Sequence, residues 1–387
     1  MARGGGGFTY LANILPQLAR LAPEQEFRAL VRNPRLANSL PALPNLEVEL
    51  LDADAGPAQR LRFTHLKIPR IAREWDADLY FSAGEGSPLQ APCPKIAAFR
   101  NPTVFTNLDQ GRPRRQKLRL AALRGLSRLS AAGCQRILFV SQDSADWIGD
   151  ALRIPLAKRS AIHHGIDIAL WSRPLDAPLH SAPYILSVSS IYRYKNYVRL
   201  IEAYAELAER QSQMPDLVII GDDQDPEYSQ QMYRARDATG ALAENIHILG
   251  EVPYANIQSY YAGASSFVFP SYLETFGHPL LEAMASGLPT VAADIPVFRE
   301  VGGDAVLYAD PHSTPALAKA MEQALFAPGL AESLAKRGRE RVQDFTWEQS
   351  ATRLLRLFTE VCAEQEARSW SRPRPQTGML EPVAIGE

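Results

Sequence analysis

The chain has 387 residues, of which 46% are apolar and 22% are charged. These values are close to those of ordinary soluble globular proteins, and they exclude a fibrous or a wholly disordered chain. At about 150 residues per domain, the length predicts two domains. No apolar run is long enough to span a membrane and no signal-like apolar core follows Met1, so we expect a cytoplasmic protein.

The cysteines and the charge exclude further classes. Cys93, Cys134 and Cys362 are far apart and form no C-x-x-C pair, which argues against a disulfide framework and against a structural zinc site. The net charge of −2 conceals an asymmetry, because residues 1–179 carry a net charge of +8 and the remainder carries −10. No helix-turn-helix, zinc-finger or RNA-recognition pattern accompanies the basic half, so we expect no nucleic-acid partner.

Short apolar runs alternate with longer helical patterns along almost the whole chain. This alternation is typical of parallel β-sheets covered by helices on both faces, so we predict an α/β fold with two sheets. The first half predicts strands at Phe27–Val31, Leu46–Leu51, Leu79–Ser82, Ile96–Phe99, Ile137–Ser141 and Ala161–His163. The second half predicts strands at Tyr184–Ser189, Leu217–Ile220, Ile246–Leu249, Phe267–Phe269, Thr290–Ala293 and Val306–Tyr308.

The two ends of the chain depart from the usual pattern. A doubly wound domain opens with a buried strand that leads into a glycine-rich turn, yet Gly4–Gly7 follow only three residues, so the first strand is expected to be missing. The proline-containing segment Trp171–Pro183 predicts an extended linker between the domains. A last helix is predicted at Trp347–Glu366, followed by a disordered, proline-containing tail.

One stretch, Gln110–Ser141, contains no acidic residue and eight basic ones. Leu118, Ala122, Leu126 and Leu129 share one helical face within it. Two interpretations stay open: an ordinary solvated helix face, or a surface attracted to an anionic membrane or to a phosphate-bearing acceptor.

The most informative segment runs from Phe269 to Pro289. A strand ends at Phe269, a loop carries Glu274, a helix begins with Pro279 at its first position, and Gly287 ends that helix. Ligands of open α/β sheets bind at the carboxyl ends of strands, and the helix N-terminus offers free N–H groups to a phosphate. A carboxylate beside this anion site is better suited to sugar hydroxyls, so the segment predicts a sugar-nucleotide site.

This segment resembles the donor-site motif of the retaining glycosyltransferases of family 4, also called glycosyl transferase group 1, which have the GT-B fold of two facing Rossmann-like domains. The resemblance rests on Glu274 and Glu282, separated by seven residues, within the context Pro-Ser, Phe-Gly and Pro-x-x-Glu-Ala-Met-Ala-x-Gly-x-Pro. It implies that Glu274 contacts the donor sugar and Glu282 the ribose. It also implies that the intervening backbone contacts the sugar and the diphosphate, at Phe276, Gly277, His278, Pro279 and Leu280.

The resemblance extends to other segments. Ile185-Leu-Ser-Val-Ser-Ser-Ile-Tyr-Arg-Tyr-Lys-Asn is similar to the first strand and turn of the family's donor domain, where an Arg usually stands five residues before a Lys. Lys195 is present, but Ser190 stands at the arginine position, so the diphosphate loses one cation unless Arg193 compensates. Gly5 and Gly6 match the glycine-rich loop that faces the donor phosphates.

Two other groups have the spacing of metal ligands. Asp223 and Asp225 form a D-x-D pair, which in another glycosyltransferase architecture holds a divalent metal, but they lie in an acidic loop and we expect no metal there. His163 and His164 would point to opposite faces of an extended segment, so we expect structural roles for both.

We therefore expect a metal-independent, retaining glycosyltransferase in which Glu274 and Lys195 are catalytic. It would move a sugar from a nucleotide-diphosphate sugar to a saccharide or lipid-linked acceptor, in cell-surface polysaccharide or glycoconjugate synthesis. The alternatives are a sugar-nucleotide-binding protein with little turnover and a GT-B relative such as a phosphorylase or an epimerase. The implied organisation is an acceptor-side domain at 1–178, a donor-binding domain at 179–345, a closing helix at 346–366 that crosses back, and a disordered tail at 367–387.

Overall fold

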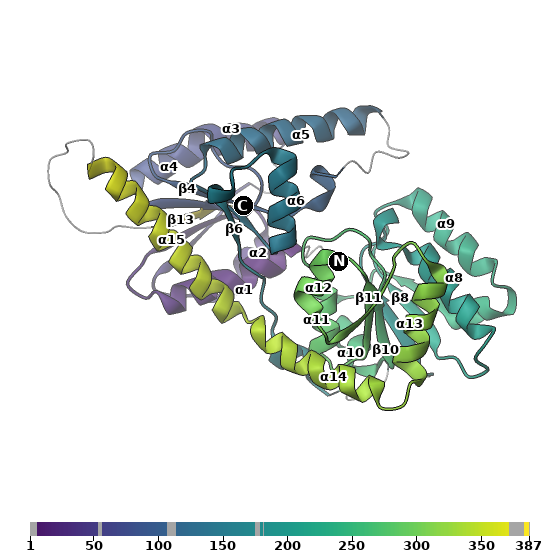
Figure 1. Cartoon of the computed structure of the whole chain (residues 1–387). Coiled ribbons are helices and arrows are strands. Elements are labelled where there is room, and N and C mark those ends of the chain that lie inside the picture. Colours follow the sequence, from purple (N-terminus) through teal and green to yellow (C-terminus); the bar gives the residue numbers. More distant parts are fainter. Residues whose placement is uncertain are drawn as a thin grey trace. The chain divides into compact units, whose positions relative to one another are not determined.

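The computed structural model describes residues 6–52, 56–106, 114–174, 179–180, 182–370 and 383–386. It divides into two compact units (Figure 1). The first unit comprises Gly4–Gly165 with Trp347–Glu387, and the second comprises Ile166–Thr346. The division falls after Gly165 rather than after residue 178, because the amide of Ile166 donates to the carbonyl of Phe345 (2.9 Å) and so joins the second unit.

The described residues of the first unit form a seven-stranded parallel sheet in the order β2-β1-β13-β3-β4-β5-β6. The first six strands along the chain correspond to the six predicted ones, with β6 shifted toward the N-terminus by two residues. Their bounds are Phe27–Val31 (β1), Leu46–Leu50 (β2), Leu79–Ser82 (β3), Lys95–Phe99 (β4), Arg136–Phe139 (β5) and Arg159–Ala161 (β6).

Strand β13 (Val383–Gly386) occupies the place between β1 and β3 where a strand preceding the glycine-rich segment would lie. It pairs in parallel with both neighbours, with Val383 opposite Phe27 on one side and opposite Leu79 on the other. The prediction of a disordered tail from residue 367 is therefore wrong at Val383–Gly386, and residues 367–370 continue the last helix. A short apolar run becomes a strand here because two flanking strands supply backbone partners that its own sequence does not reveal.

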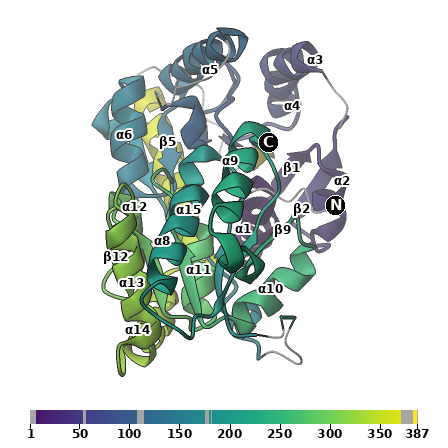
Figure 2. The ribbon, with the colours of Figure 1, turned by 90° about the vertical axis from the view of Figure 1, so that its right-hand side faces the viewer.

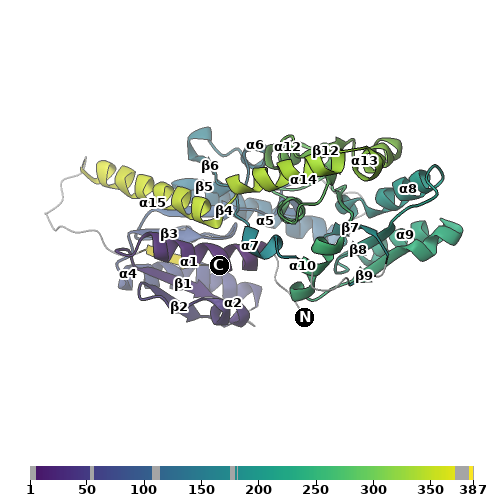
Figure 3. The same ribbon diagram turned by 90° about the horizontal axis from the view of Figure 1, so that it is seen from below.

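Helices cover both faces of this sheet. On one face, the helices α1 (Gly6–Leu21), α2 (Pro34–Ser39) and α15 (Trp347–Trp370) pack on alternate strand residues such as Ala29 and Val31, and α1 lies over β1 and β2 (Figure 3). On the other face, Leu30 and Tyr80 pack with α4, while Phe99 and Phe139 pack with α5 and α6. The remaining helices are α3 (Pro57–Arg62), α4 (Ile68–Glu74), α5 (Arg114–Gly133) and α6 (Gln142–Leu152).

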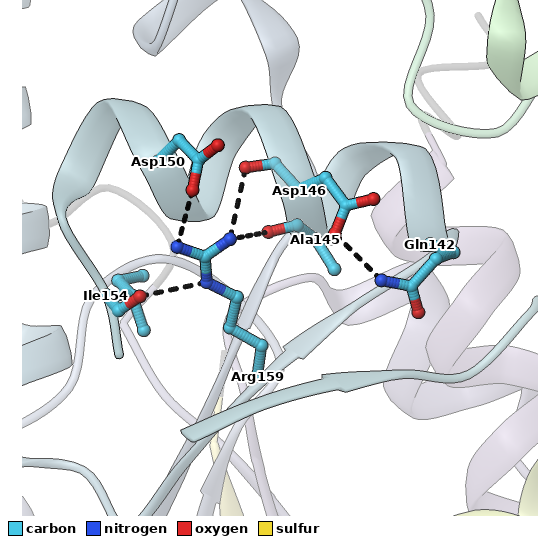
Figure 4. Close-up of polar contacts among 6 residues, drawn as sticks. All are labelled: Gln142, Ala145, Asp146, Asp150, Ile154 and Arg159. Atoms are coloured by element: carbon cyan, nitrogen blue, oxygen red, sulfur yellow. Dashed lines mark hydrogen bonds and ion pairs between the residues drawn. The ribbon is translucent and has the colours of Figure 1, made fainter. Parts of the chain in front are cut away.

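Arg159 attaches the edge strand β6 to α6 and to the segment that follows this helix (Figure 4). Its guanidinium donates to the carbonyl of Ile154 (2.9 Å), to those of Ala145 (3.2 Å) and Asp146 (3.3 Å), and to the carboxylate of Asp150 (2.7 Å). Ala145 and Asp146 lie in the first half of α6, and Ile154 lies two residues after its end, so one side chain joins β6 to the helix and to the segment that follows it.

The described residues of the second unit form a six-stranded parallel sheet in the order β12-β11-β10-β7-β8-β9. All six strands lie where they were predicted, within one residue at each end. Their bounds are Tyr184–Val188 (β7), Asp216–Ile220 (β8), Ile246–Gly250 (β9), Ser266–Phe269 (β10), Thr290–Ala293 (β11) and Val306–Ala309 (β12).

Both faces of the second sheet are also covered. Helices α8 (Tyr197–Ala208), α9 (Pro226–Asp237) and α13 (Thr314–Phe326) bury one face (Figure 2). The opposite face carries a chain of aromatic rings, Tyr261, Phe267, Phe269 and Phe298, with successive centroids 4.9–6.0 Å apart. The helices on that side and the linker helix are α7 (Ile168–Trp171), α10 (Tyr254–Gly263), α11 (His278–Ala285), α12 (Pro296–Gly302) and α14 (Leu330–Arg341).

Helix α5 carries an apolar stripe on its exposed side. Leu118 is 72% exposed and Leu129 is 55% exposed, and Ala122 and Leu126 are exposed as well. Within the part of the chain that the structure describes, α5 and every other helix lack the length or the apolar character to cross a bilayer.

Candidate active site

The site is built where β7 and β10 end, at neighbouring positions of the second sheet. After β7 the chain forms a 3₁₀ turn at Arg193–Lys195, and Asn196 then adopts a left-handed conformation (φ 65°) immediately before α8. The buried amide of Asn196 donates to the carbonyls of Pro270 (3.2 Å) and Pro311 (2.8 Å). The first bond holds the turn, and with it Lys195, against the loop that follows β10, and the second holds the turn to the segment that follows β12.

The loop after β10 is held to the same turn by its first residues. The hydroxyl of Ser271 donates to the carbonyl of Tyr194 (3.2 Å), and the amide of Tyr272 donates to the same carbonyl (3.0 Å). Glu274 follows within this loop. Its position is therefore determined by backbone contacts to the Lys195 turn and does not depend on side-chain attraction alone.

Lys195 and Glu274, the two residues predicted to be catalytic, form an ion pair through Nζ and Oε1. Their side chains are only 11% and 12% exposed, so the pair is shielded from bulk water and less screened than a surface pair. Nζ also lies 5.4 Å from the ring centroid of Phe269. Each charge compensates the other, and a ligand that brings an anion to Lys195 and hydroxyls to Glu274 would replace this pairing at both residues.

The N-terminus of α11 lies in the same loop, after Gly277. Gly277 has φ 92°, and a Cβ atom built there would lie 2.7 Å from the Phe298 ring, so only glycine fits this position. The helix begins at His278, so Pro279 is its second residue and not its first. Pro279 has no N–H and the Leu280 amide donates to the Gly277 carbonyl (3.0 Å), so this end of α11 attracts an anion chiefly through the positive end of the helix dipole.

The side chains of this turn divide into two kinds. Phe276 and Leu280 are buried, so only their backbone groups can meet a ligand. His278 is half-buried, and its ring lies edge-on to Phe276 with centroids 5.3 Å apart. Phe276 also contacts the ring of Phe345 (6.1 Å), which fixes the turn against the end of the unit.

Glu282 lies one turn into α11 and is half-buried. Burial raises the pKa of Glu282 to about 7, and a hydrogen bond with Tyr261 opposes part of that rise. Its carboxyl group is therefore close to half-ionised at neutral pH, and hydroxyl donors from a ligand would favour its charged form.

The other residues expected to bind the sugar nucleotide differ in their surroundings. Ser190 is half-buried in the segment between β7 and the Lys195 turn. Arg193 does not fill the missing cation position, because Nη1 donates to Gln231 (3.0 Å) and the guanidinium lies over the Tyr228 ring of α9. Gly5 lies outside the described residues, and Gly6 is the first residue of α1, so it belongs to a helix and not to a loop.

Asp223 and Asp225 have local roles at the start of α9. Asp223 Oδ1 accepts hydrogen bonds from the Asp225 amide (3.1 Å) and the Ser229 hydroxyl (2.7 Å), and Asp225 Oδ1 accepts one from the Tyr228 amide (3.2 Å). The D-x-D spacing is thus that of a helix cap. His164 stacks on Tyr10 with centroids 4.7 Å apart, as expected for a structural histidine.

Asn196 and Ser271 position Lys195 and Glu274, but the sequence analysis did not identify either of them. Their local signals are weak: Lys-Asn before a helix is compatible with a left-handed cap, and Pro-Ser after a strand with a turn. Neither signal predicts which distant carbonyl group accepts the hydrogen bond from the side chain.

Comparison with known proteins gives matches over both units. Residues 4–170 match the family model described as Glycosyltransferase Family 4, and residues 177–341 match the model described as Glycosyl transferases group 1. Among curated proteins, the chain is 32% identical over 183 residues to O-antigen chain mannosyltransferase B of Escherichia coli, covering 45% of each chain. It is also 32% identical over 223 residues to D-inositol 3-phosphate glycosyltransferase of Corynebacterium efficiens, covering 52% of this chain and 51% of that protein. The aligned part spans about half the length of these curated relatives.

Solved structures resemble nearly the whole chain. Anabaena HepE in complex with UDP and glucose superposes with a TM-score of 0.71 at 17% identity, over 93% of this chain and 97% of that one. A glycosyltransferase of Rickettsia africae superposes with a TM-score of 0.68 at 15% identity, over 93% and 96% of the two chains. At these identities the likeness shows the fold, and the fold is GT-B.

Proposed function

The chain belongs to glycosyltransferase family 4, the group 1 glycosyl transferases, and from this premise we propose that it transfers a sugar from a nucleoside-diphosphate sugar to a saccharide or lipid-linked acceptor, with retention of anomeric configuration. The names of the curated relatives, an O-antigen mannosyltransferase and an inositol-phosphate glycosyltransferase, support acceptors used in cell-surface polysaccharide or glycoconjugate synthesis. The UDP and glucose bound in the HepE structure support a nucleotide-sugar donor.

The observation that carries the proposal is the shielded Lys195–Glu274 pair beside the N-terminus of α11. In the proposed complex the diphosphate lies between Lys195 Nζ and the N-terminus of α11, and Glu274 accepts hydrogen bonds from the sugar hydroxyls. Glu282, one turn further, accepts from the ribose. As the bond to the sugar breaks, negative charge grows on the leaving diphosphate, and a preorganised cation and helix terminus stabilise that charge more than they stabilise the ground state.

This arrangement places a cation and a helix N-terminus beside the diphosphate, and from it we propose metal-independent transfer. Asp223 and Asp225 are occupied as the cap of α9. Excess EDTA is expected to leave turnover nearly unchanged, whereas Lys195→Ala is expected to lower it strongly. Full loss with EDTA and recovery with manganese would contradict this part of the proposal.

The acceptor is proposed to bind in the first unit, at the carboxyl ends of β3 and β4. The carboxylate of Glu85, after β3, accepts from the amides of Arg100 (3.2 Å) and Asn101 (2.9 Å), after β4, so the two loops form one structure. The Arg100 guanidinium lies over the Tyr10 ring of α1, 4.6 Å from its centroid. Three elements thus meet at the sheet edge where ligands of open α/β sheets bind.

The test of the donor site compares Glu274→Gln with an exposed control, Glu227→Gln, on the same unit. We expect Glu274→Gln to reduce transfer by about a hundredfold or more with the fold intact, since a positioned active-site group contributes on that scale. The assay is release of nucleoside diphosphate across a panel of nucleotide sugars, with circular dichroism to check folding. Turnover near the wild-type rate in Glu274→Gln would overturn the assignment.

A second candidate function is binding of a sugar nucleotide with little turnover, and Ser190 favours it. With serine in place of the family's arginine and Arg193 turned toward α9, Lys195 lacks a second cation beside it on this turn. Donor binding without release of nucleoside diphosphate by the wild-type protein would support this alternative. Ser190→Arg would then be expected to raise turnover.

We further propose that α5 attaches the protein peripherally to an anionic bilayer. The helix has no acidic residue, and Arg114, Arg115, Lys117 and Arg119 are exposed beside its exposed leucines. Arg124 and Arg128 also lie on this helix, where they donate to the carbonyls of Val104 (2.6 Å) and Ala151 (2.9 Å). Each of the four exposed charges near the surface contributes about 1 kcal/mol at low salt.

Vesicle sedimentation tests this attachment. We expect binding to vesicles with anionic lipid at low salt and release at high salt, with loss of binding in the Lys117→Glu and Arg119→Glu double variant. Arg353→Glu with Arg356→Glu, the same charge change on exposed positions of α15, is the matched control and should bind normally. Equal partitioning onto neutral and anionic vesicles would contradict the proposal and show that α5 is an ordinary solvated helix.

A further inference from the structure

Three potential metal ligands meet at the amino end of the second sheet, away from the proposed donor site. Asp216 is the first residue of β8, His247 is the second residue of β9, and His180 precedes β7. β7, β8 and β9 are adjacent, so their starts lie side by side. Lys195 follows the other end of β7, about 16 Å away by the rise of a five-residue strand.

The side chains converge on one oxygen atom. Asp216 Oδ2 lies 2.8 Å from Nε2 of His180 and 3.1 Å from Nε2 of His247. All three candidate ligand atoms lie within 4.8 Å of one another. Bonds of about 2.0–2.1 Å in a tetrahedral zinc site place the ligand atoms about 3.3 Å apart, so the observed spacing requires only small side-chain movements.

The surroundings hold these side chains in a ligating orientation. Asn245 Nδ2 donates to Asp216 Oδ1 (2.7 Å), which leaves Oδ2 directed at the two imidazoles. The ring of His180 also packs edge-on against Tyr184 (5.2 Å). Such supporting contacts are the usual second layer of a metal site.

We propose that His180, Asp216 and His247 bind a divalent transition-metal ion of the zinc type, which clamps the segment before β7 to β8 and β9. Two imidazoles and one carboxylate suit zinc and its neighbours, whereas magnesium and calcium prefer oxygen ligands alone. The side chains are 18%, 13% and 33% exposed, so the site is sheltered yet open enough for water as a fourth ligand. The clamp acts on the stability of the second unit and takes no part in the proposed transfer.

The experiment uses tag-free full-length protein stripped with EDTA and titrated with zinc chloride. Metal content and thermal unfolding are measured on the wild type, His180→Gln and His247→Gln, with His65→Gln in the first unit as control. We expect one zinc per chain and, at a hundredfold excess over Kd, a rise in Tm of about 5 °C or more in the wild type and in His65→Gln. Both effects should disappear in His180→Gln and His247→Gln. Cobalt chloride, whose bound ion is coloured and substitutes for zinc, should give a d–d absorption band with the wild type but not with His180→Gln or His247→Gln.

Two outcomes would overturn the proposal. One is that the folded wild type takes up no zinc at micromolar concentration. The other is that uptake is the same in the wild type and in both site variants. In either case the three side chains form a hydrogen-bonded group and nothing more. Circular dichroism at 20 °C verifies that each variant is folded before its metal content is compared.

Discussion

Replacing Glu282 by glutamine removes an ionisable group whose charged form the native state disfavours. Burial raises its pKa from 4.5 to about 7, despite the hydrogen bond with Tyr261. In the unfolded chain the carboxyl ionises near pH 4.5, while in the native state it stays protonated until about pH 7. Below pH 4.5 the carboxyl is protonated in both states, so its ionisation does not change the free energy of unfolding. Between these two pH values the cost to the native state grows, and above pH 7 it is constant.

The size of this effect follows from the two pKa values. Their difference corresponds to about 3 kcal/mol for a fully buried group. Because Glu282 is half-buried, solvent screening reduces this value, and we expect about 2 kcal/mol. The stability of Glu282→Gln relative to the wild type should therefore increase by about 2 kcal/mol between pH 4.5 and pH 8.

Urea unfolding of both proteins at pH 4.5, 6 and 8 measures this difference. Glu227→Gln, which makes the same change at an exposed position of the same unit, is the matched control. A pH-independent difference for Glu282→Gln would refute the reasoning. The proposed ribose contact adds a second readout, because hydroxyl donors favour the charged carboxylate: wild-type affinity for a nucleoside diphosphate should rise from pH 6 to pH 8, and that of Glu282→Gln should not.

Three further changes test the packing. Gly221→Ala should destabilise the protein by more than about 2 kcal/mol, because the added Cβ would lie 1.9 Å from the carbonyl oxygen of Ser189. A Cβ added at Gly125 meets open space, so Gly125→Ala should be neutral or stabilising. Thermal unfolding compares the two variants, and equal Tm values would contradict the close approach at Gly221. Arg159→Met should cost about 2 kcal/mol in urea unfolding, since it removes the group that donates to the carbonyls of Ala145 and Ile154 and to the carboxylate of Asp150. A cost below 0.5 kcal/mol, which is about the scatter of ordinary surface substitutions, would contradict that role. Truncation after residue 382 removes β13 and leaves the facing edges of β1 and β3 without a partner. We expect a lower Tm and self-association through these two edges. An unchanged Tm and a monomeric elution volume would show that the sheet does not need this strand.

The strands could be predicted because their signal is local. Each buried strand of a parallel sheet is a short apolar run bounded by polar or turn-forming residues, and twelve such runs became the strands β1 to β12. The turn around Gly277 could be predicted for the same reason: Glu274, Gly277 and Glu282 are close in sequence, so their spacing alone sets one loop and one helical turn.

The contact between Lys195 and Glu274 could be seen only in the tertiary structure. Lys195 and Glu274 belong to different strand–helix connections, and only the adjacency of β7 and β10 brings them together. Asn196 and Ser271 act through carbonyl groups of the opposite loop, whose positions no local pattern contains. The resemblance to a known family indicated the two charged residues but not the contacts that hold them.

The C-terminal strand and the histidine cluster were decided by tertiary structure alone. Val383–Gly386 is too short and too isolated to be a strand on its own, and it becomes one because β1 and β3 both offer unpaired backbone groups at the correct spacing. His180, Asp216 and His247 are far apart in sequence and follow no ligand spacing, yet three adjacent strands begin at the same edge. Sequence by itself therefore determined the elements and the local turn chemistry of this protein, whereas pairings between distant segments depended on strand order, which apolar periodicity does not encode.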